Sequence, residues 1–454
     1  MLPFAKEIDA FFKKITGNTG FRFAPWPIFF AGMLLLLIST MFMFHQVDTA
    51  VSLALYLAPV WLPFLLADGA LSLWLTLKRS EFINSQTYIV LEIKPPRNLV
   101  KTPLAMEAFF SSIHLSPGES TWYARSIKGA VRPWWSFEMV SFEGRVHFYV
   151  WTRANFRRIV ESQMYAQYPG VQITEALDYT RCISAVPGEW SIWGCDYRKI
   201  EKDPLPIKTY IEFGLDKVQE EPEQIDPLAS ITEFLGSAGK GEYVWLQFII
   251  QVHSGHKYNK LNADNKPYTW RDEGKEIVEK IRKDTRTPYV DPTTGKEMPG
   301  FPNPTKGESE KMAAIERNTS KLGFDVGARC IYLAKPDSFK PTMIAQMIGL
   351  FKPFSVEGWN GIKATAWLMI FDDYPWEIGS SKLKKRYTVK MVEAYRRRQF
   401  FHEPFSEGLT RNDIMVLSTE ELATLYHIPS AGIHTPGLER VSSATGEAPA
   451  NLPL

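Results

Sequence analysis

The sequence IFFAGMLLLLISTMFMF, residues Ile28–Phe44, is a continuous apolar run without a charged residue, and it decides how the chain is organised. A second apolar run, Val51–Leu77, contains one charge, Asp68. Each run is long enough for a helix that crosses the hydrocarbon core of a bilayer, which takes about 20 residues. Because the link at 45–50 has room for little more than a tight turn, we predict a transmembrane helical hairpin over residues 25–79.

Basic residues lie on the two outer sides of this hairpin. Those before it are Lys6, Lys13, Lys14 and Arg22, and those after it are Lys78 and Arg79. The turn holds Asp48 and neither Lys nor Arg. The positive-inside rule therefore predicts a two-pass protein of the inner (cytoplasmic) membrane, with both termini and the soluble domain in the cytoplasm. Residues 1–24 have apolar and basic residues at helical spacing, which favours an amphipathic segment on the inner leaflet, with a solvated leader as the alternative.

The composition agrees with a folded cytoplasmic body. The chain has 454 residues, of which 22% are charged and 45% hydrophobic, and its net charge is only +2. A charge this small excludes a global field that attracts nucleic acid, so any basic surface must be local. The cysteines, Cys182, Cys195 and Cys330, show no metal-ligand spacing and are expected to be free thiols.

From residue 80 to 200 the pattern predicts an α+β module. Its strands are expected at 87–93, 135–141, 146–152 and from Val171 onward, and its helices at 102–113 and 155–165. Gly144 lies in the turn between the second and third strands, as is typical of a β-hairpin. The order strand, helix, strand, strand, helix, strand is that of a ferredoxin-like fold.

Residues 201–405 are predicted to repeat this order. Strands are expected at 208–213 (KTYIEF), 243–252, 328–334 and near 365–371, and helices at 226–235 and 340–351. Residues 254–308 are polar and charged and form a long insertion with one charged helix at about 270–283. A further helix is expected after it, at 311–322. Residues 406–454 are expected to be a C-terminal linker or tail. The predicted fold class is thus α+β, with a transmembrane hairpin and two ferredoxin-like modules.

The search for catalytic chemistry gives no site. Gly236–Gly241 (GSAGKG) lacks the hydroxyl residue and the following helix of a phosphate-binding loop. Residues 367–373 (WLMIFDD) have the form of a Walker B strand, but no loop is present to supply phosphate and Mg²⁺. His253 and His256 have no further ligand at a spacing that would complete a metal site. We therefore expect no enzymatic activity, no cofactor and no metal.

One local basic cluster is a candidate contact for nucleic acid or anionic lipid. It consists of Lys382, Lys384, Lys385, Arg386, Lys390, Arg396, Arg397 and Arg398. Tyr387, Tyr395 and Phe400 are interleaved with these residues, and basic and aromatic side chains together bind single strands. The alternative is the solvated face of a helix.

Several stretches resemble a known family. They are Ile93–Pro103 (IKPPRNLVKTP), Ser136–Trp151 (SFEMVSFEGRVHFYVW), Val160–Gly170 (VESQMYAQYPG), Leu235–Gln247 (LGSAGKGEYVWLQ) and Leu425–Pro453. In them the chain resembles the membrane-anchored N-terminal half of type IV secretion and conjugation ATPases, the coupling-protein-like group of the HerA/FtsK superfamily. The resemblance covers about residues 80–453.

The resemblance implies a role in secretion or DNA transfer. Members of that family continue into a RecA-like motor domain with both Walker motifs, and this sequence ends where that domain is expected. We therefore expect a non-catalytic scaffold or adaptor whose ATPase is a separate chain or a missing domain. The expected partners are the membrane, a P-loop ATPase in trans, DNA and further copies of the chain. A membrane-tethered module that binds nucleic acid or anionic lipid is the alternative.

Overall fold

The computed structural model describes most of the chain after the predicted hairpin. It describes residues 56, 58–115, 121–183, 188–216, 226–254, 258, 261–262, 266–290, 297–365, 380–402, 414–430 and 437–441. The chain divides into two compact units, Met1–Leu77 and Lys78–Leu454. Helix α4 spans Ala58–Asn84.

The predicted hairpin lies largely outside the described residues. Its first apolar run and its turn are among the residues not described, as is the predicted amphipathic segment 1–24. In the part of the chain that is described, no helix has the length and the apolar character required to cross a membrane.

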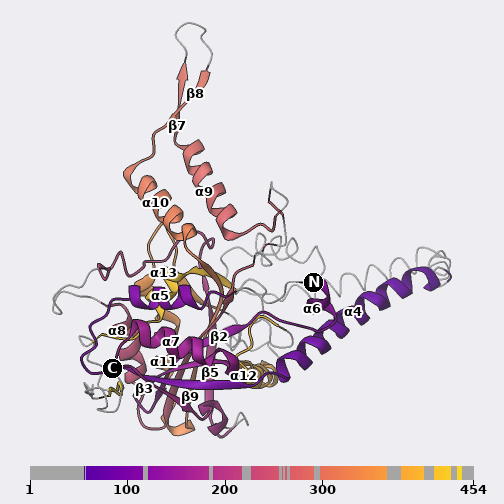
Figure 1. Cartoon of the computed structure of the whole chain (residues 1–454), viewed down its shortest axis with the longest axis vertical. Helices are drawn as coiled ribbons and strands as arrows, with labels where there is room; N and C mark the ends of the chain where they lie inside the picture. The colour runs from indigo at the N-terminus through magenta and orange to yellow at the C-terminus, as the bar shows by residue number, and fades with distance from the viewer. Residues whose placement is uncertain are drawn as a thin grey trace, which may run out of the picture. The chain divides into compact units, whose positions relative to one another are not determined.

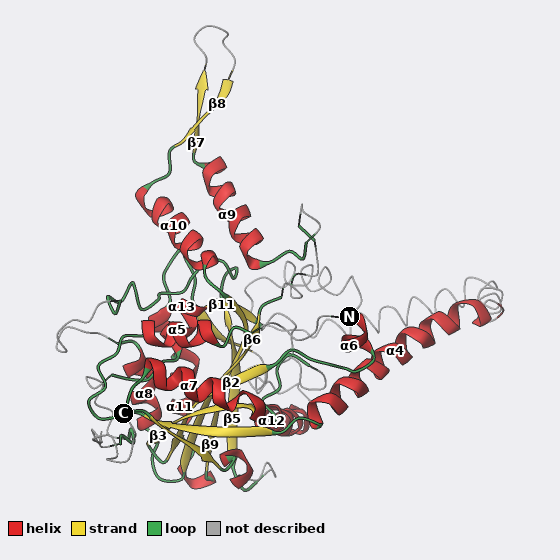
Figure 2. Ribbon diagram, viewed as in Figure 1, coloured by secondary structure: helices red, strands yellow, loops and turns green. Residues whose placement is uncertain are grey.

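The second unit is built on a nine-stranded antiparallel sheet, shown in Figures 1 and 2. The strands are β1 Tyr88–Lys94, β2 Trp134–Phe142, β3 Arg145–Arg153, β4 Gln172–Ala176, β5 Ser191–Lys199, β6 Glu242–Val252, β9 Gly323–Ala334, β10 Ile362–Thr365 and β11 Met415–Ser418. Their spatial order is β10-β5-β9-β6-β2-β3-β1-β4, and β11 pairs with β9. The chain is thus an α+β protein with one large sheet.

Helices separate the strands along the chain. In the first half they are α5 Leu104–Ser112, α6 Trp122–Ser126 and α7 Arg157–Gln167, and in the second half α8 Leu228–Gly236, α11 Pro341–Gly349, α12 Ser380–Arg396 and α13 Thr419–Leu425. The β2–β3 hairpin closes at Glu143 and Gly144, both with positive φ, as a two-residue turn requires. This hairpin and the strands β1 and β6 agree with the sequence prediction to within one or two residues.

The first strand of the second half lies elsewhere than predicted. Residues 208–213 form no strand, and 210–213 form turns. Strand β5, whose residues fall within the predicted first module, instead pairs with β9 and β10. Glu212 accepts hydrogen bonds from the backbone N–H of Thr209 (2.8 Å) and from its hydroxyl group, and Phe213 N–H donates to Thr209 O. These local bonds hold a helical turn and remove Thr209 from strand pairing.

Helices cover both faces of the sheet. On β2, Phe137 packs edge-on against Phe109 and Phe110 of α5, while its neighbour Glu138 points to the opposite face. On β5, Tyr197 donates a hydrogen bond to the carbonyl of Met347 in α11, and Gly194 lies against Met391 of α12. Because successive strand residues alternate between faces, α11 and α12 lie on opposite sides of β5.

The insertion between β6 and β9 forms an arm. It consists of α9 Trp270–Asp284, β7 Arg286–Val290, β8 Glu297–Pro302 and α10 Lys306–Ser320. Both of its predicted helices are present, and Figure 1 shows that the two helices lie side by side and carry the β7–β8 hairpin away from the sheet. Leu205, Val278 and Ile315 form a small hydrophobic core at its base, separate from the core of the sheet.

Part of the predicted C-terminal linker belongs to the core. Residues 415–418 form β11, which continues the edge beside β9 where β5 ends, and α13 packs on α5. All the residues from 415 to 425 are buried. The prediction of a linker from residue 406 is therefore wrong for this segment, because four strand residues and a short helix are too brief to give a clear period.

Candidate functional site

A row of polar residues crosses the sheet on the face that α12 covers. Glu138 of β2, Gln247 of β6, Arg329 of β9 and Asp196 of β5 are paired in register from strand to strand, and all four are fully buried. Gln247 donates to Glu138 (2.9 Å), and Nε of Arg329 donates to Asp196 (2.8 Å). Buried charges are costly unless they are paired, so these contacts favour the observed register between neighbouring strands.

Arg398, just after α12, connects this row to the end of β4. Its guanidinium group donates to both oxygens of Glu138, at 3.0 and 3.2 Å, and to both oxygens of Asp178, at 2.6 and 3.0 Å. The Tyr179 hydroxyl donates to Glu138 (2.8 Å) and lies 2.9 Å from the hydroxyl of Tyr395. The network ties α12 to β2 and to the segment after β4.

Electrostatics in this network favour the charged forms. Burial raises the pKa of Asp178, but the charge of Arg398 and the hydrogen bonds from Arg398 and Thr180 outweigh it, so the pKa lies below its usual value. Burial raises the pKa of Tyr179 well above 10, so the phenol is a neutral donor. The network therefore acts as a structural ion pair with neutral donors around it.

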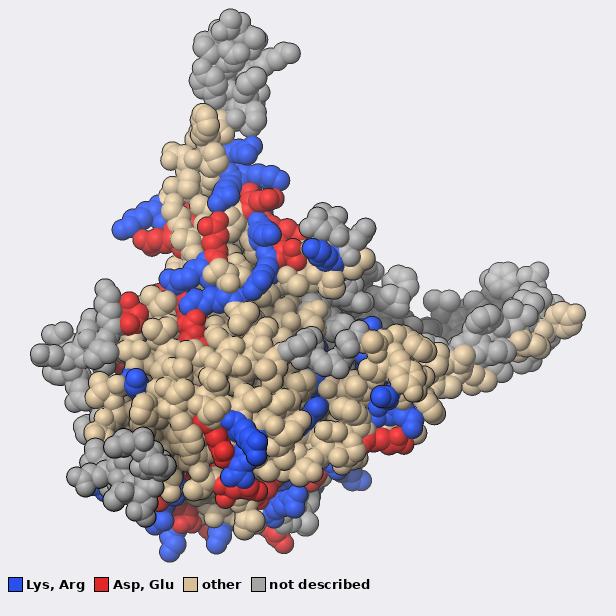
Figure 3. Space-filling view, in the orientation of Figure 1, with Lys and Arg blue, Asp and Glu red and all other residues tan. Residues whose placement is uncertain are grey.

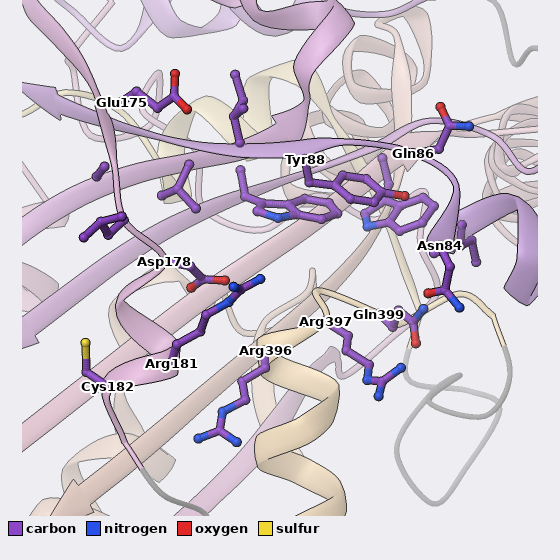
Figure 4. Close-up of a pocket in the computed structure, with 17 residues that line it drawn as sticks. Asn84, Gln86, Tyr88, Glu175, Asp178, Arg181, Cys182, Arg396, Arg397 and Gln399 are labelled. Carbon is purple, nitrogen blue, oxygen red and sulfur yellow. The ribbon is translucent and has the colours of Figure 1, made fainter.

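A cavity of about 640 Å³ opens beside this network. It lies between the start of β1, the end of β4 with the turn that follows, and the last turn of α12, as Figure 4 shows. Its lining includes Tyr88, Trp134, Trp151, Arg181, Arg396, Arg397 and Gln399. Tyr88 stacks on Trp151 with 4.3 Å between ring centroids and an angle of 11°.

The structure divides the predicted basic cluster into groups with different surroundings. Lys382, Lys385, Arg386, Lys390 and Arg397 are exposed, Lys384 and Arg396 are half-buried, and Arg398 is fully buried. Arg396 donates to the backbone carbonyls of Thr180 (3.1 Å) and Ile183 and to Glu393. The exposed part of α12 is thus available to a partner, while Arg396 and Arg398 stabilise the fold.

The aromatic residues among the basic ones are not free to stack on bases. Tyr395 and Phe400 are fully buried. The ring of Tyr395 packs on Trp245, and the ring of Phe400 packs on Phe401. The predicted combination of basic and aromatic side chains on one surface is therefore not formed by these two residues.

Three side chains of metal-ligand type meet at β1 and β3. One ligand atom each of Glu92, His147 and Glu439 lies within 4.8 Å of the others. However, Lys94 Nζ lies 3.1 Å from Glu439 and 3.7 Å from Glu92. A lysine ammonium group in contact with both carboxylates already supplies the positive charge, so we assign an ion-pair cluster here.

The glycine-rich segment 236–241 and His253, which the sequence analysis considered as binding motifs, have structural roles. Residues 236–241 form the turn from α8 to β6, in which Gly241 has a φ of +77° and its N–H donates to Glu143. His253 Nδ1 lies 2.5 Å from Asp325, which also accepts from Arg132. Residues 367–373 and His256 lie outside the described residues.

Sequence reasoning missed the polar row and the cavity. Glu138 and Arg398 are 260 positions apart, and the strand that carries Glu138 reads simply as apolar with interspersed polar residues. Pairing in register across four strands is the signal, and it becomes visible only once the strand order is known.

Comparison with other proteins gives one family. A search of curated proteins found no match. A family model described as a domain of unknown function (DUF8128) matches residues 74–440, which is most of the chain and includes the sheet, the arm and the cavity. The chain belongs to this family, DUF8128.

Proposed function

We propose that this chain is a non-catalytic, membrane-anchored scaffold or adaptor of a translocation complex like those of type IV secretion and conjugation. It would act with a P-loop ATPase on a separate chain and assemble with further copies of itself. The resemblance of Ile93–Pro103 and Val160–Gly170 to the N-terminal half of such ATPases supports this role.

The observation that carries the proposal is the arm. Its helices have 15 residues each, so they extend about 22 Å. Beyond them the β7–β8 hairpin presents Phe301, which is 91% exposed. Phe301 lies in β8 next to Pro302, which pairs with Arg286 at the end of the hairpin nearest the helices, so a large aromatic side chain on a projecting element is exposed for contact with a partner.

The β7–β8 hairpin is poorly suited to pairing with another sheet. Pro288 and Pro299 lie opposite each other in β7 and β8. Proline has no N–H to donate, so these strands offer few hydrogen bonds to an added strand. Side-chain contacts such as that of Phe301 would therefore dominate recognition.

The fold proposed from the sequence has further support in the strand order. The order β4-β1-β3-β2 in the first half corresponds to β10-β5-β9-β6 in the second, with helices between the same pairs of strands. We propose that the sheet consists of two ferredoxin-like modules joined through β2 and β6. The second module would begin with β5 rather than at residue 201.

The membrane anchor is the hairpin proposed for residues 25–79. The uncharged run Ile28–Phe44 and the basic residues on the outer sides support insertion with both termini in the cytoplasm. A reporter fused after Val47 is expected to be active outside the cytoplasm, and one fused to the C-terminus inside. A C-terminal reporter that is active outside would contradict this topology.

Purification of the tagged full chain from its native membrane tests the adaptor role. We expect a P-loop ATPase to co-purify in a fixed ratio, and deletion of residues 286–302 to abolish this without loss of the chain. The chain alone is expected to hydrolyse no ATP above background. Hydrolysis by the pure chain, or an ATPase that stays bound after the deletion, would contradict the proposal.

The exposed half of α12 supports a second candidate function, binding of nucleic acid or anionic lipid. Lys382, Lys385, Arg386 and Lys390 are exposed on α12 and follow each other at intervals of three, one and four residues. Such a row attracts phosphate groups, and the attraction falls as salt rises.

Replacing these four residues by alanine tests this candidate. Affinity for a DNA duplex, or for vesicles with an anionic lipid, is expected to fall and its salt dependence to become weaker. The matched control replaces four exposed basic residues elsewhere, Lys101, Arg158, Lys352 and Lys363, with the same loss of charge. Equal effects of the two sets would show that only net charge matters.

A further inference from the structure

The cavity beside α12 contains polar groups that the fold leaves unused. Gln399 is 8% exposed, and its Oε1 accepts no hydrogen bond from the described part of the chain. Arg181 is exposed and forms no ion pair with a described residue. A buried acceptor without a donor is costly, so Gln399 is suited to a ligand that brings an N–H or O–H group.

The other charged groups of the cavity are already matched. Asp178 is paired with Arg398, and Glu175 with Arg157 at 2.5 Å. Arg396 donates to two backbone carbonyls. Arg181 is thus left with positive charge that no carboxylate of the cavity compensates, which favours an anionic ligand.

An aromatic wall faces these groups. Trp134 and Trp151 are buried, whereas Tyr88 is only partly buried, and one of its ring faces is stacked on Trp151. Tyr88 itself lines the cavity, so its exposed part can contact a ligand there. Figure 4 shows Tyr88 across the cavity from Arg396, Arg397 and Gln399. A planar ligand ring that stacks on Tyr88 would lie in the same cavity as the polar groups of Arg181 and Gln399.

We propose that this cavity binds a nucleotide, either free or as part of a single strand. The base would stack on Tyr88 and donate a hydrogen bond to Gln399, and the phosphate would bind Arg181. Stacking of a base on an aromatic side chain contributes about 1–3 kcal/mol. A planar guanidinium group binds two phosphate oxygens at once.

The size of the cavity fits this ligand. Its volume of about 640 Å³ lies within the range of roughly 300–1,000 Å³ that is typical of small-molecule sites. The inference is independent of the adaptor role, because it concerns a different part of the surface from the arm and needs no partner protein.

Cys182 provides a direct readout. It lines the cavity and is exposed, whereas Cys195 and Cys330 are buried. Alkylation of the purified full chain, followed by mass spectrometry, reports how accessible each thiol is. We expect AMP to slow alkylation of Cys182 in a saturable way, while the two buried thiols stay unreactive and show that the fold is intact.

Variants assign the effect to the proposed contacts. Arg181→Ala is expected to weaken AMP binding at least tenfold. It should not unfold the chain, because the Arg181 side chain lies at the surface. Tyr88→Phe keeps the ring and should retain binding, whereas Tyr88→Leu should weaken it. Arg158→Ala removes an exposed arginine of α7 outside the cavity and is expected to leave AMP binding unchanged.

Further probes show whether the base is needed for binding and whether the ligand is a free nucleotide or a single strand. Ribose 5-phosphate and inorganic phosphate should protect Cys182 much less than AMP, since they lack the base. A single-stranded oligonucleotide that protects at lower concentration than AMP identifies a strand as the source, and the reverse order identifies a free nucleotide. No protection by millimolar AMP or by the oligonucleotide, equal binding to Arg181→Ala, or equal protection by ribose 5-phosphate would overturn the proposal.

Discussion

The sheet and the arm both contain many charged residues, but they use them in opposite ways. In the sheet, Arg398 and Glu138 form an ion pair in which both side chains are fully buried. In the arm, Arg282 and Glu316 form a pair at 3.0 Å in which both side chains are more than half exposed. Figure 3 shows Lys and Arg interspersed with Asp and Glu along the arm. Charge determines how the sheet assembles, whereas in the arm it keeps a projecting element in water.

The largest expected effect comes from breaking the buried pair. Arg398→Met removes the partner of Glu138, which is fully buried, and of Asp178, whose side chain is 19% exposed. Loss of one partner of a buried pair costs about 3–5 kcal/mol. Denaturation of the purified chain by urea measures this loss. Lys385→Met on the exposed part of the same helix is the control and should change stability by less than about 0.5 kcal/mol.

A smaller, local effect is expected in the arm. Val278→Ala removes two methyl groups from its small core and should cost about 2 kcal/mol. Because this core is separate from that of the sheet, the loss should be confined to α9 and α10. Hydrogen exchange should become about 30-fold faster there, as 1.4 kcal/mol corresponds to a factor of ten. Equally faster exchange in β6 and β9 would show that the arm and sheet unfold together.

Acid is expected to weaken the sheet network through Asp178. Its pKa is lower in the folded chain than in the unfolded one, so the unfolded state takes up a proton first as the pH falls. The stability that Asp178 contributes is complete above about pH 4, the unfolded pKa, and is lost as the pH falls through the folded value. The free energy of unfolding of Asp178→Asn should therefore be lower than that of the parent at pH 7, and the difference should shrink as the pH falls. Urea unfolding at several pH values measures it.

The smallest effect on stability is expected in the β7–β8 hairpin of the arm. Phe301→Ser changes a side chain that is 91% exposed, so the free energy of unfolding should stay within about 0.5 kcal/mol. The melting temperature measures this. A marked loss would show that Phe301 packs within the chain and contributes to the stability of the fold.

Much of the sheet could be predicted because its signals are local. β2, β3 and β6 have long apolar stretches, and Gly144 marks the turn between two of them. β5 was not predicted because its sequence, SIWGCDYRK, is mixed. Its Asp196 is buried only because Arg329 pairs with it from 133 positions away.

The division of the basic cluster could not be read from the sequence for the same reason. Arg398 and Lys385 look alike as members of one charge run. Their surroundings differ because Glu138 and Asp178 reach Arg398 from distant parts of the chain. Burial of a charge depends on tertiary partners, and a local pattern holds no information about them.

Photo-crosslinking from the β7–β8 hairpin of the arm tests the adaptor role most directly. A benzophenone amino acid in place of Phe301 is activated in native membranes, and the same group in place of Lys352, exposed on the body, is the control. The account predicts that position 301 crosslinks to a chain with P-loop motifs and that position 352 does not. Crosslinking of position 301 only to further copies of this chain, or to the same proteins as position 352, would contradict it.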